Sequence, residues 1–191
     1  MAGTTVNEDN VVYKTLHRVI NEGGYPCTLE QVLAQGAGKE KRQAIVDVLF
    51  LQHPDLDETV INQLFQHFLI ALEEAYRDLA VSPQQGAEEI FQYLKDKGII
   101  VVLNTGYNQE TAEGLIAKLG WKQGVHFDAL ITASQVQNGR PHPDMILLAK
   151  EQFYISDTRQ IAKIGDSIVD IEEGQRANCG LSIGISTGAQ T

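Results

Sequence analysis

The sequence predicts an α/β fold, in which helices cover a parallel sheet and an all-helical segment precedes most of the strands. Two patterns indicate this fold. Over residues 9–80, apolar side chains recur at intervals of three and four, which is the spacing of amphipathic helices. From residue 83 onward, helical stretches alternate with short, continuously apolar stretches, as in parallel sheets whose strands are buried on both faces.

Three helices are expected in the first part. The longest covers residues 59–79, and its apolar positions share one stripe: Val60, Ile61, Leu64, Phe65, Phe68, Leu69, Leu72, Ala75, Tyr76 and Leu79. Another runs over residues 12–20 and a third over residues 44–49, and both lie next to glycines that can end or turn a helix. We therefore expect residues 9–81 to form a helical bundle.

Four cycles of helix and strand are expected in the second part. The helices are predicted at residues 87–97, 109–119, 143–153 and 171–177, and the strands at residues 99–103, 130–132, 160–164 and 181–185. Ligands of such sheets bind at the carboxyl ends of the strands. The loops that follow the strands are therefore where functional residues are expected.

Composition excludes several classes of protein. The 191 residues include 15 Lys and Arg against 25 Asp and Glu, and the net charge of −10 argues against a nucleic-acid partner. The longest apolar run, residues 99–103, is far shorter than the roughly 20 residues that cross a bilayer, and no signal segment opens the chain. We therefore expect a cytoplasmic protein that does not bind membranes.

Two strand ends carry polar groups that suit a phosphate and a metal ion. Thr105 and Gly106 could hold one oxygen of an anion, although Thr-Gly after a strand is also ordinary turn chemistry. Asp166 and Asp170 stand four residues apart in the segment Gly-Asp-Ser-Ile-Val-Asp, and carboxylates at that place suit Mg²⁺. The alternative is that Asp170 only caps the next helix and Asp166 only fills a turn.

A third loop adds a cation. Arg140 lies in the segment Asn-Gly-Arg-Pro-His-Pro at residues 138–143, just before a predicted helix whose N-terminus also favours anions. The alternative is an arginine exposed on a surface loop.

Taken with the opening segment Met-Ala-Gly-Thr-Thr-Val, these motifs resemble the haloacid dehalogenase superfamily, in its phosphonoacetaldehyde hydrolase (phosphonatase) branch. The signatures follow in the family's order: an opening loop, Thr105, a basic residue before Pro-x-Pro, and Gly-Asp-Ser-x-x-Asp. Two departures from the wider superfamily, Ala2 and Arg140, are shared with that branch. The resemblance implies a discontinuous Rossmann-like core at residues 1–8 and 82–191, with a helical cap at residues 9–81 inserted after the first loop.

The same resemblance implies roles for individual residues. Mg²⁺ would be bound by the Ala2 carbonyl and Asp166, with Asp170 supporting the site. The phosphoryl group would be bound by the opening loop, the loop after the second strand and the basic residue, which here are Gly3, Thr4, Thr105, Gly106 and Arg140. Among these, Thr105 and Arg140 are expected to act catalytically by holding the transferring oxygens.

The resemblance also implies a cap lysine that forms a Schiff base with the substrate aldehyde. In phosphonatases it follows a Met-Gly-x-x-Lys pattern, and residues 35–39 here read Gln-Gly-Ala-Gly-Lys, so Lys39 is the match. Gln35 departs from the methionine of that pattern, and Arg42 replaces the histidine three residues after the lysine. The alternative is a solvated lysine beside Lys41 and Arg42.

We therefore expect a Mg²⁺-dependent hydrolase that cleaves the carbon–phosphorus bond of phosphonoacetaldehyde or a similar 2-oxo-phosphonate, through this imine and an aspartyl-phosphate. One alternative is a phosphatase of a small phosphate ester. The other is a non-catalytic binding relative that lacks the nucleophile. Pairing through the caps into a homodimer is expected from the resemblance alone.

The family's nucleophile is the aspartate immediately before the position of Met1, at the end of a strand that lies in the middle of the sheet. That strand would pair with the predicted strands at 99–103 and 160–164, whose edges otherwise carry unpaired N–H and C=O groups. We therefore expect this chain to be a fragment that lacks the first strand and the C-terminal elements of a longer protein. On that interpretation it is inactive by itself.

Overall fold

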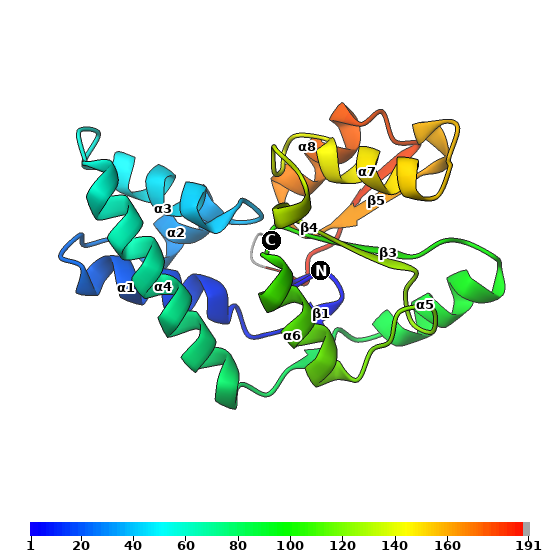
Figure 1. The fold of residues 1–191 in the computed structure, drawn as a ribbon, viewed down its shortest axis with the longest axis horizontal. Coiled ribbons are helices and arrows are strands. Elements are labelled where there is room, and N and C mark those ends of the chain that lie inside the picture. The colour runs from blue at the N-terminus through cyan, green and yellow to red at the C-terminus, as the bar shows by residue number, and fades with distance from the viewer. Residues whose placement is uncertain (189–191) are drawn as a thin grey trace.

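Figure 1 shows two parts, a group of helices from the first half of the chain and an α/β part. The computed structural model describes residues 1–188, apart from the side chain of Asp78. Within these residues, none of the helices has the length and apolar character that crossing a membrane requires.

Four helices form the first part. They are α1 (Val11–Glu22), α2 (Leu29–Gly36), α3 (Lys41–Phe50) and α4 (Glu58–Asp78). Helices α1 and α3 each pack against both α2 and α4. The apolar stripes expected from the sequence face inward, and Leu16, Ile45 and Phe68 are fully buried. Helix α2 was not expected, although it begins with a capping box in which Thr28 and Gln31 bond each other's backbone N–H groups.

The second part alternates helices and strands as predicted. Its helices are α5 (Ala87–Asp96), α6 (Gln109–Leu119), α7 (Asp144–Gln152) and α8 (Ile168–Arg176). Its strands are β3 (Val102–Thr105), β4 (Ala129–Thr132), β5 (Ala162–Gly165) and β6 (Leu181–Gly184). Helices α7 and α8 lie on one side of the strands and α6 on the other (Figure 1).

Strand β3 begins later than the predicted start at residue 99. Gly98 adopts a positive φ of 70°, and the Ile99 N–H donates to the carbonyl oxygen of Leu94, so these residues finish helix α5. The Val101 N–H is then bound by the side chain of Asp128 at 2.8 Å. The first residues of the apolar run 99–103 therefore follow the end of helix α5, and only its last two residues belong to β3.

The core strands form two parallel pairs, β3 with β4 and β5 with β6. The predicted parallel pairing is confirmed within each pair. Over residues 1–188, no backbone ladder joins β3 to β5, and Ile164 and Ile183 are more than a third exposed. The resemblance described above places a further strand between these two pairs.

A short antiparallel pair lies where the chain enters and leaves the helical part. Strand β1 (Val6–Asn7) pairs with β2 (Ser82–Pro83), next to the boundary predicted from the change in pattern at residue 82. The two strands are only two residues long, so periodicity could not reveal them. The pair holds the two connecting segments side by side.

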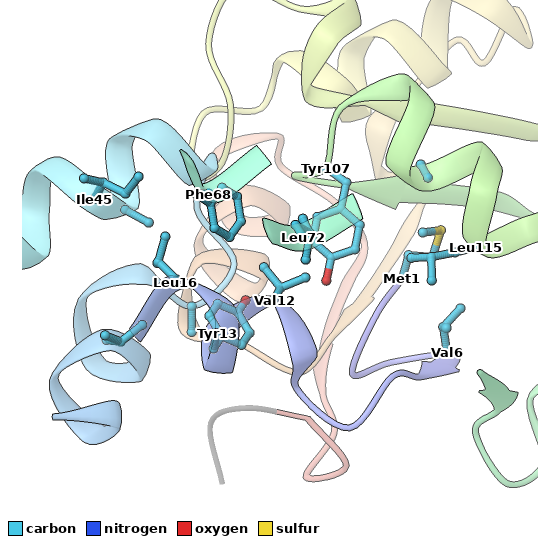
Figure 2. Close-up of a cluster of buried hydrophobic side chains, with 14 of the residues drawn as sticks. Met1, Val6, Val12, Tyr13, Leu16, Ile45, Phe68, Leu72, Tyr107 and Leu115 are labelled. Atoms are coloured by element: carbon cyan, nitrogen blue, oxygen red, sulfur yellow. The ribbon is translucent and has the colours of Figure 1, made fainter. Parts of the chain in front are cut away.

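One buried cluster runs through both parts (Figure 2). It extends from Ile45 and Leu16 in the helical part, through Tyr107, to Met1 and Leu115 in the α/β part. Because close-packed side chains transmit position from one element to the next, this cluster fixes how the helices face the strand ends.

Candidate active site

A pocket lies between the helical part and the carboxyl ends of β3 and β5. The residues that line it come from the opening loop, α1, the loop before α3, and the loops after the strands: Met1, Ala2, Gly3, Glu8, Asn10, Tyr13, Gly38, Lys41, Thr105, Tyr107, Arg140, Asp166, Ser167 and Asp170. This is the edge of the sheet at which the sequence predicted functional residues.

The opening loop forms a tight turn against β5. The amide nitrogens of Thr5 and Val6 both donate to the carbonyl oxygen of Met1. Gly3 has a φ of +78°, and a Cβ atom there would overlap the Asp166 carboxylate, so only glycine fits. The hydroxyl of Thr4 donates to Oδ1 of Asp166 at 2.8 Å. The loop thereby lies directly on the Asp166 carboxylate.

The donor set beside Asp166 suits a hard cation that keeps several waters. Asp166 is partly exposed and lines the pocket together with Ala2, so a carboxylate and a backbone carbonyl can face one ion. Over the described part of the chain, no group of three His, Cys, Asp or Glu side chains is placed to hold a metal. The single carboxylate of Asp166 with oxygen donors around it is a set that Mg²⁺ can use, because Mg²⁺ is commonly bound through one or two carboxylates plus substrate phosphate.

Asp170 lies in a buried ionic cluster. Its Oδ1 pairs with Nη1 of Arg140 and with Nζ of Lys163 at 3.0 Å, and its Oδ2 accepts from the Ser167 hydroxyl at 2.5 Å. Burial favours the neutral acid, but Arg140 and Lys163 outweigh it and hold the pKa of Asp170 well below its usual range. Asp170 also closes the capping box of α8, in which Ser167 is the N-cap, so the alternative that Asp170 caps this helix is confirmed.

Arg140 is not an exposed loop residue, because its side chain is 8% exposed. Burial by itself would lower its pKa, and the Asp170 and Glu173 carboxylates together more than offset this. Its Nε has no hydrogen-bond partner within the described residues, and its guanidinium lines the pocket. An anion in the pocket would satisfy that unpaired donor.

Thr105 lies at the end of β3, with its side chain turned into the molecule. Its Oγ1 accepts from the Tyr107 N–H at 3.3 Å, which is the turn chemistry considered above, and its hydroxyl proton can still be donated into the pocket. The next residue, Gly106, lies against the helical part: a Cβ atom there would be 3.1 Å from the Gly38 carbonyl oxygen. The loop after β3 and the loop before α3 therefore touch.

Lys39 is outside the set of residues that line the pocket. Its Nζ forms an ion pair with Oδ2 of Asp47 at 2.5 Å, and both side chains are about one quarter exposed. Only its backbone faces inward, where the Lys39 carbonyl oxygen accepts from Nζ of Lys41 at 3.0 Å. The amine of the lysine that matches the motif is therefore paired with Asp47, and Lys39 is not among the residues that line the pocket.

Lys41 lies in the pocket instead. The residue is 7% exposed, and its Nζ lies 3.5 Å from the hydroxyl of Tyr13 and 5.6 Å from the ring centroid of Tyr107. Burial, and then the positive charge of Arg140, lower the pKa of Lys41 to about 8. With that pKa, about one tenth of this amine is neutral at pH 7, and the neutral form is the one that attacks a carbonyl.

A signal in the sequence could have identified Lys41. It precedes Ala44, Ile45 and Val48 by three, four and seven residues, so it continues the buried stripe of α3. A lysine on the apolar face of a helix is rare unless it is functional or paired.

Glu8 is a second buried titratable group that the sequence analysis did not select. It is 3% exposed, and its two carboxyl oxygens accept from the hydroxyls of Tyr76 at 3.1 Å and Tyr107 at 3.4 Å. Burial raises the pKa of Glu8 to about 7. The carboxyl group is therefore partly protonated at neutral pH.

The pocket thus brings two kinds of polar group together. Arg140, Thr105 and Asp166 suit a phosphoryl group with a divalent cation. The amine of Lys41 and the carboxyl of Glu8 line the same pocket beside aromatic side chains. A small molecule that carries both a phosphoryl group and a carbonyl matches this combination.

Gly38 offers a test of the contact between the two parts. It has a φ of +76°, and a Cβ atom there would overlap the side chains of Ser167 and Val169. We expect Gly38→Ala to displace the loop before α3 and, with it, Lys41 at the start of α3. The expected loss in kcat/KM of the full-length protein is about 100-fold, which is the cost of misplacing a catalytic group by about 1 Å. Gly24→Ala is the matched control, because Gly24 also has a positive φ but nothing lies within 4 Å of the added atom. Equal losses in both variants would show that backbone strain, not contact, is responsible.

Comparison with known proteins gives the same family as the motifs in the sequence. Residues 1–183 match the profile of the family described as haloacid dehalogenase-like hydrolase. The chain is 34% identical over 129 residues to the phosphonoacetaldehyde hydrolase of Lactiplantibacillus plantarum, which covers 67% of this chain and 48% of the relative. It is 27% identical over 197 residues to that of Hahella chejuensis, covering 97% and 66% respectively. The chain therefore spans about half to two thirds of the length of these relatives.

A solved structure is also similar. The chain matches the crystal structure of a phosphonoacetaldehyde hydrolase-like protein from Oleispira antarctica with a TM-score of 0.79 and 26% identity. The match covers 98% of this chain and 70% of that one.

Proposed function

Because this chain belongs to the haloacid dehalogenase-like hydrolase family, we propose that it is a Mg²⁺-dependent hydrolase of phosphonoacetaldehyde or a similar 2-oxo-phosphonate. The observation that carries the proposal is the buried amine of Lys41 in the same pocket as Arg140, Thr105 and Asp166. Similarity to phosphonoacetaldehyde hydrolases supports the substrate class.

The proposal assigns the imine to Lys41 and not to Lys39. An imine forms when a neutral amine attacks a carbonyl, and burial lowers the pKa of Lys41 to about 8. The amine of Lys39 is paired with Asp47, and Lys39 is not among the residues that line the pocket. Lys39 would then support the loop through its ion pair and its backbone carbonyl.

In the same pocket, Arg140 and Thr105 would hold the phosphoryl oxygens. Arg140 is fixed by Asp170, which is itself held by Lys163, so the guanidinium is positioned before substrate arrives. Asp166 and the Ala2 carbonyl would hold Mg²⁺, which supplies positive charge to offset that of the phosphoryl group. Thr4 would orient the Asp166 carboxylate through its 2.8 Å hydrogen bond.

The chemistry then follows from an electron sink at Lys41. The amine attacks the aldehyde carbon, water leaves, and a protonated imine forms. When a carboxylate attacks phosphorus, the electron pair of the carbon–phosphorus bond moves onto carbon and is delocalised into the imine, giving an enamine. The family motif places that carboxylate on an aspartate adjoining Met1. Protonation at carbon and hydrolysis of the imine release acetaldehyde, and hydrolysis of the acyl phosphate releases phosphate.

Comparing two substrates of similar size tests the proposal. Phosphonoacetaldehyde and phosphoglycolate both carry a phosphoryl group, but only the first has an aldehyde and a carbon–phosphorus bond. We expect the full-length protein to release acetaldehyde and phosphate from the first and to act on the second at least about tenfold more slowly, measured as kcat/KM. Preferential release of phosphate from the ester, without acetaldehyde, would favour a phosphatase. No turnover of either compound would favour a non-catalytic relative.

Asp166 should control the affinity for Mg²⁺. Asp166→Asn removes an anionic oxygen ligand, and we expect Mg²⁺ binding measured by calorimetry to weaken by about tenfold or more, the scale of effect seen at metal sites. Asp55→Asn, at an exposed position, is the control with the same charge change. Unchanged Mg²⁺ affinity would leave Asp166 with only its role in the turn.

A further inference from the structure

Resting on the proposed imine, we propose that Glu8 is the catalytic acid that donates a proton to the carbinolamine oxygen as water leaves. The carbinolamine is the adduct that forms when an amine adds to a carbonyl, before water is lost. Its oxygen must receive a proton to depart. The structure contains a buried carboxyl group, that of Glu8, which lines the same pocket as the Lys41 amine and is not among the residues assigned to the phosphoryl group.

The position of Glu8 is defined by three elements. It lies directly after β1 and accepts hydrogen bonds from Tyr76 of α4 at 3.1 Å and from Tyr107 of the loop after β3 at 3.4 Å. Tyr107 also lies beside Lys41, whose Nζ is 5.6 Å from its ring centroid. Glu8 and Lys41 both line the pocket, so a substrate carbonyl at Lys41 would lie near the Glu8 carboxyl group.

The groups around Glu8 suit a proton donor and not an ion pair. Its two hydrogen-bonding neighbours, Tyr76 and Tyr107, have pKa values well above their ordinary range because they are buried, so they stay neutral and cannot replace it as the acid. Tyr13 is buried as well, with a pKa near 12. Lys41 is the cation that faces Glu8 from α3, and its attraction lowers the pKa of Glu8 only in part.

Imine formation at Lys41 involves two proton transfers before water leaves. Neutral Lys41 adds to the aldehyde carbon, and its nitrogen passes a proton to the oxygen that was the carbonyl. Protonated Glu8 then gives its proton to the resulting hydroxyl group, the carbon–oxygen bond breaks, and water leaves. The nitrogen lone pair forms the carbon–nitrogen double bond, which leaves a protonated imine next to the Glu8 carboxylate. In the reverse direction the carboxylate takes a proton from the water that hydrolyses the final imine.

The test measures imine formation directly, without requiring phosphorus transfer. The chain is mixed with phosphonoacetaldehyde, quenched with borohydride at increasing times, and the reduced adduct is quantified by mass spectrometry across pH 5.5 to 9.5. We expect the wild-type rate to fall at low pH, where Lys41 is protonated, and at high pH, where Glu8 has lost its proton. Glu8→Gln should slow trapping by about 100-fold or more, the usual contribution of a general acid, and should remove the decline at high pH.

Controls separate this role from a structural one. Asp9→Asn makes the same change at the adjacent carboxylate, which is exposed and pairs with Lys14, and should leave rate and pH profile unchanged. Phosphate affinity of Glu8→Gln should also equal that of the wild type, because the Glu8 carboxyl group bonds Tyr76 and Tyr107 whereas Arg140 is held by Asp170. Should Glu8→Gln fail to fold, Glu8→Asp decides: it keeps an acid but retracts it, so the rate should fall while the decline at high pH remains.

Two outcomes overturn the proposal in distinguishable ways. If Glu8→Gln traps the adduct at the wild-type rate, or Glu8→Asp does so where Glu8→Gln cannot be studied, Glu8 is not the acid, although the imine mechanism stands. If the wild-type protein yields no adduct, the proposed function itself fails and the role of Glu8 fails with it.

Discussion

Replacing Lys41 with arginine should abolish carbon–phosphorus cleavage. Arginine keeps the positive charge but is never neutral in proteins, so it cannot form an imine under these conditions. For the full-length protein we expect kcat to fall by at least about a thousandfold, within the range by which losing one member of a covalent catalytic unit reduces kcat. Lys39→Arg, two residues away, should retain most of the activity because arginine can keep the ion pair with Asp47.

The pair of variants discriminates between two assignments. The motif pattern favours Lys39, whereas burial, the lowered pKa and the pocket favour Lys41. A large loss in Lys39→Arg with little effect in Lys41→Arg would restore the assignment from the motif. Small effects in both variants would indicate that no imine is used, and ester hydrolysis would then be the better account.

Replacing Asp170 with asparagine should cause the largest loss of stability. Arg140 and Lys163 would remain buried without their shared carboxylate, and breaking a buried ion pair costs about 3–5 kcal/mol. Urea denaturation of the variant and the wild type measures this difference. Asp157→Asn is the control, since Asp157 forms an exposed ion pair with Arg159 and its loss should matter little. A small change in both variants would contradict the importance of the buried cluster.

The same residue predicts how stability depends on pH. The pKa of Asp170 is held well below its usual range in the folded protein, so the folded state favours the carboxylate. Its stabilising contribution is therefore complete above about pH 4, the ordinary pKa of an unfolded aspartate, and is lost as the pH falls below that value. The Asp170→Asn variant should lack this part of the decline in acid.

The sequence reveals those elements of the fold in which periodicity is long enough to read. Helix α4 and the helix–strand alternation after residue 83 follow directly from the apolar spacing. Helix α2 did not, because its eight residues are too few for the helical spacing of Leu29, Val32 and Leu33 to repeat. Strands β1 and β2 are too short for any repeat, and their pairing depends on contacts between residues some 75 positions apart.

Four residues that line the pocket could be predicted because each belongs to a loop with a recognisable motif. Thr105, Arg140, Asp166 and Asp170 came from three separate loops, and the structure brings them to one pocket. Motif spacing could not show how they are paired. The ion pair between Arg140 and Asp170 arises only when the loop after β4 folds over the end of β5.

Motif spacing could not show which lysine faces the pocket, because the direction of each side chain depends on where α3 begins. Glu40 is the N-cap of α3, and its carboxylate accepts from the backbone N–H groups of Arg42 and Gln43. This makes Lys41 the first helical residue and turns its side chain toward the pocket, while Lys39 remains in the loop. Lys39 and Lys41 are only two positions apart, but the amine of Lys39 is partly exposed and that of Lys41 is buried.

The central claim is that the amine of Lys41 forms an imine with a carbonyl substrate, and one measurement tests it most directly. The protein is incubated with phosphonoacetaldehyde and borohydride, digested, and the peptide spanning residues 35–50 is fragmented in the mass spectrometer to locate the added ethyl or phosphonoethyl group. We predict that the group is found on Lys41 and that inorganic phosphate, which competes for Arg140, slows its appearance. An adduct on Lys39, or no adduct at all while phosphate is still released from the substrate, would contradict this account.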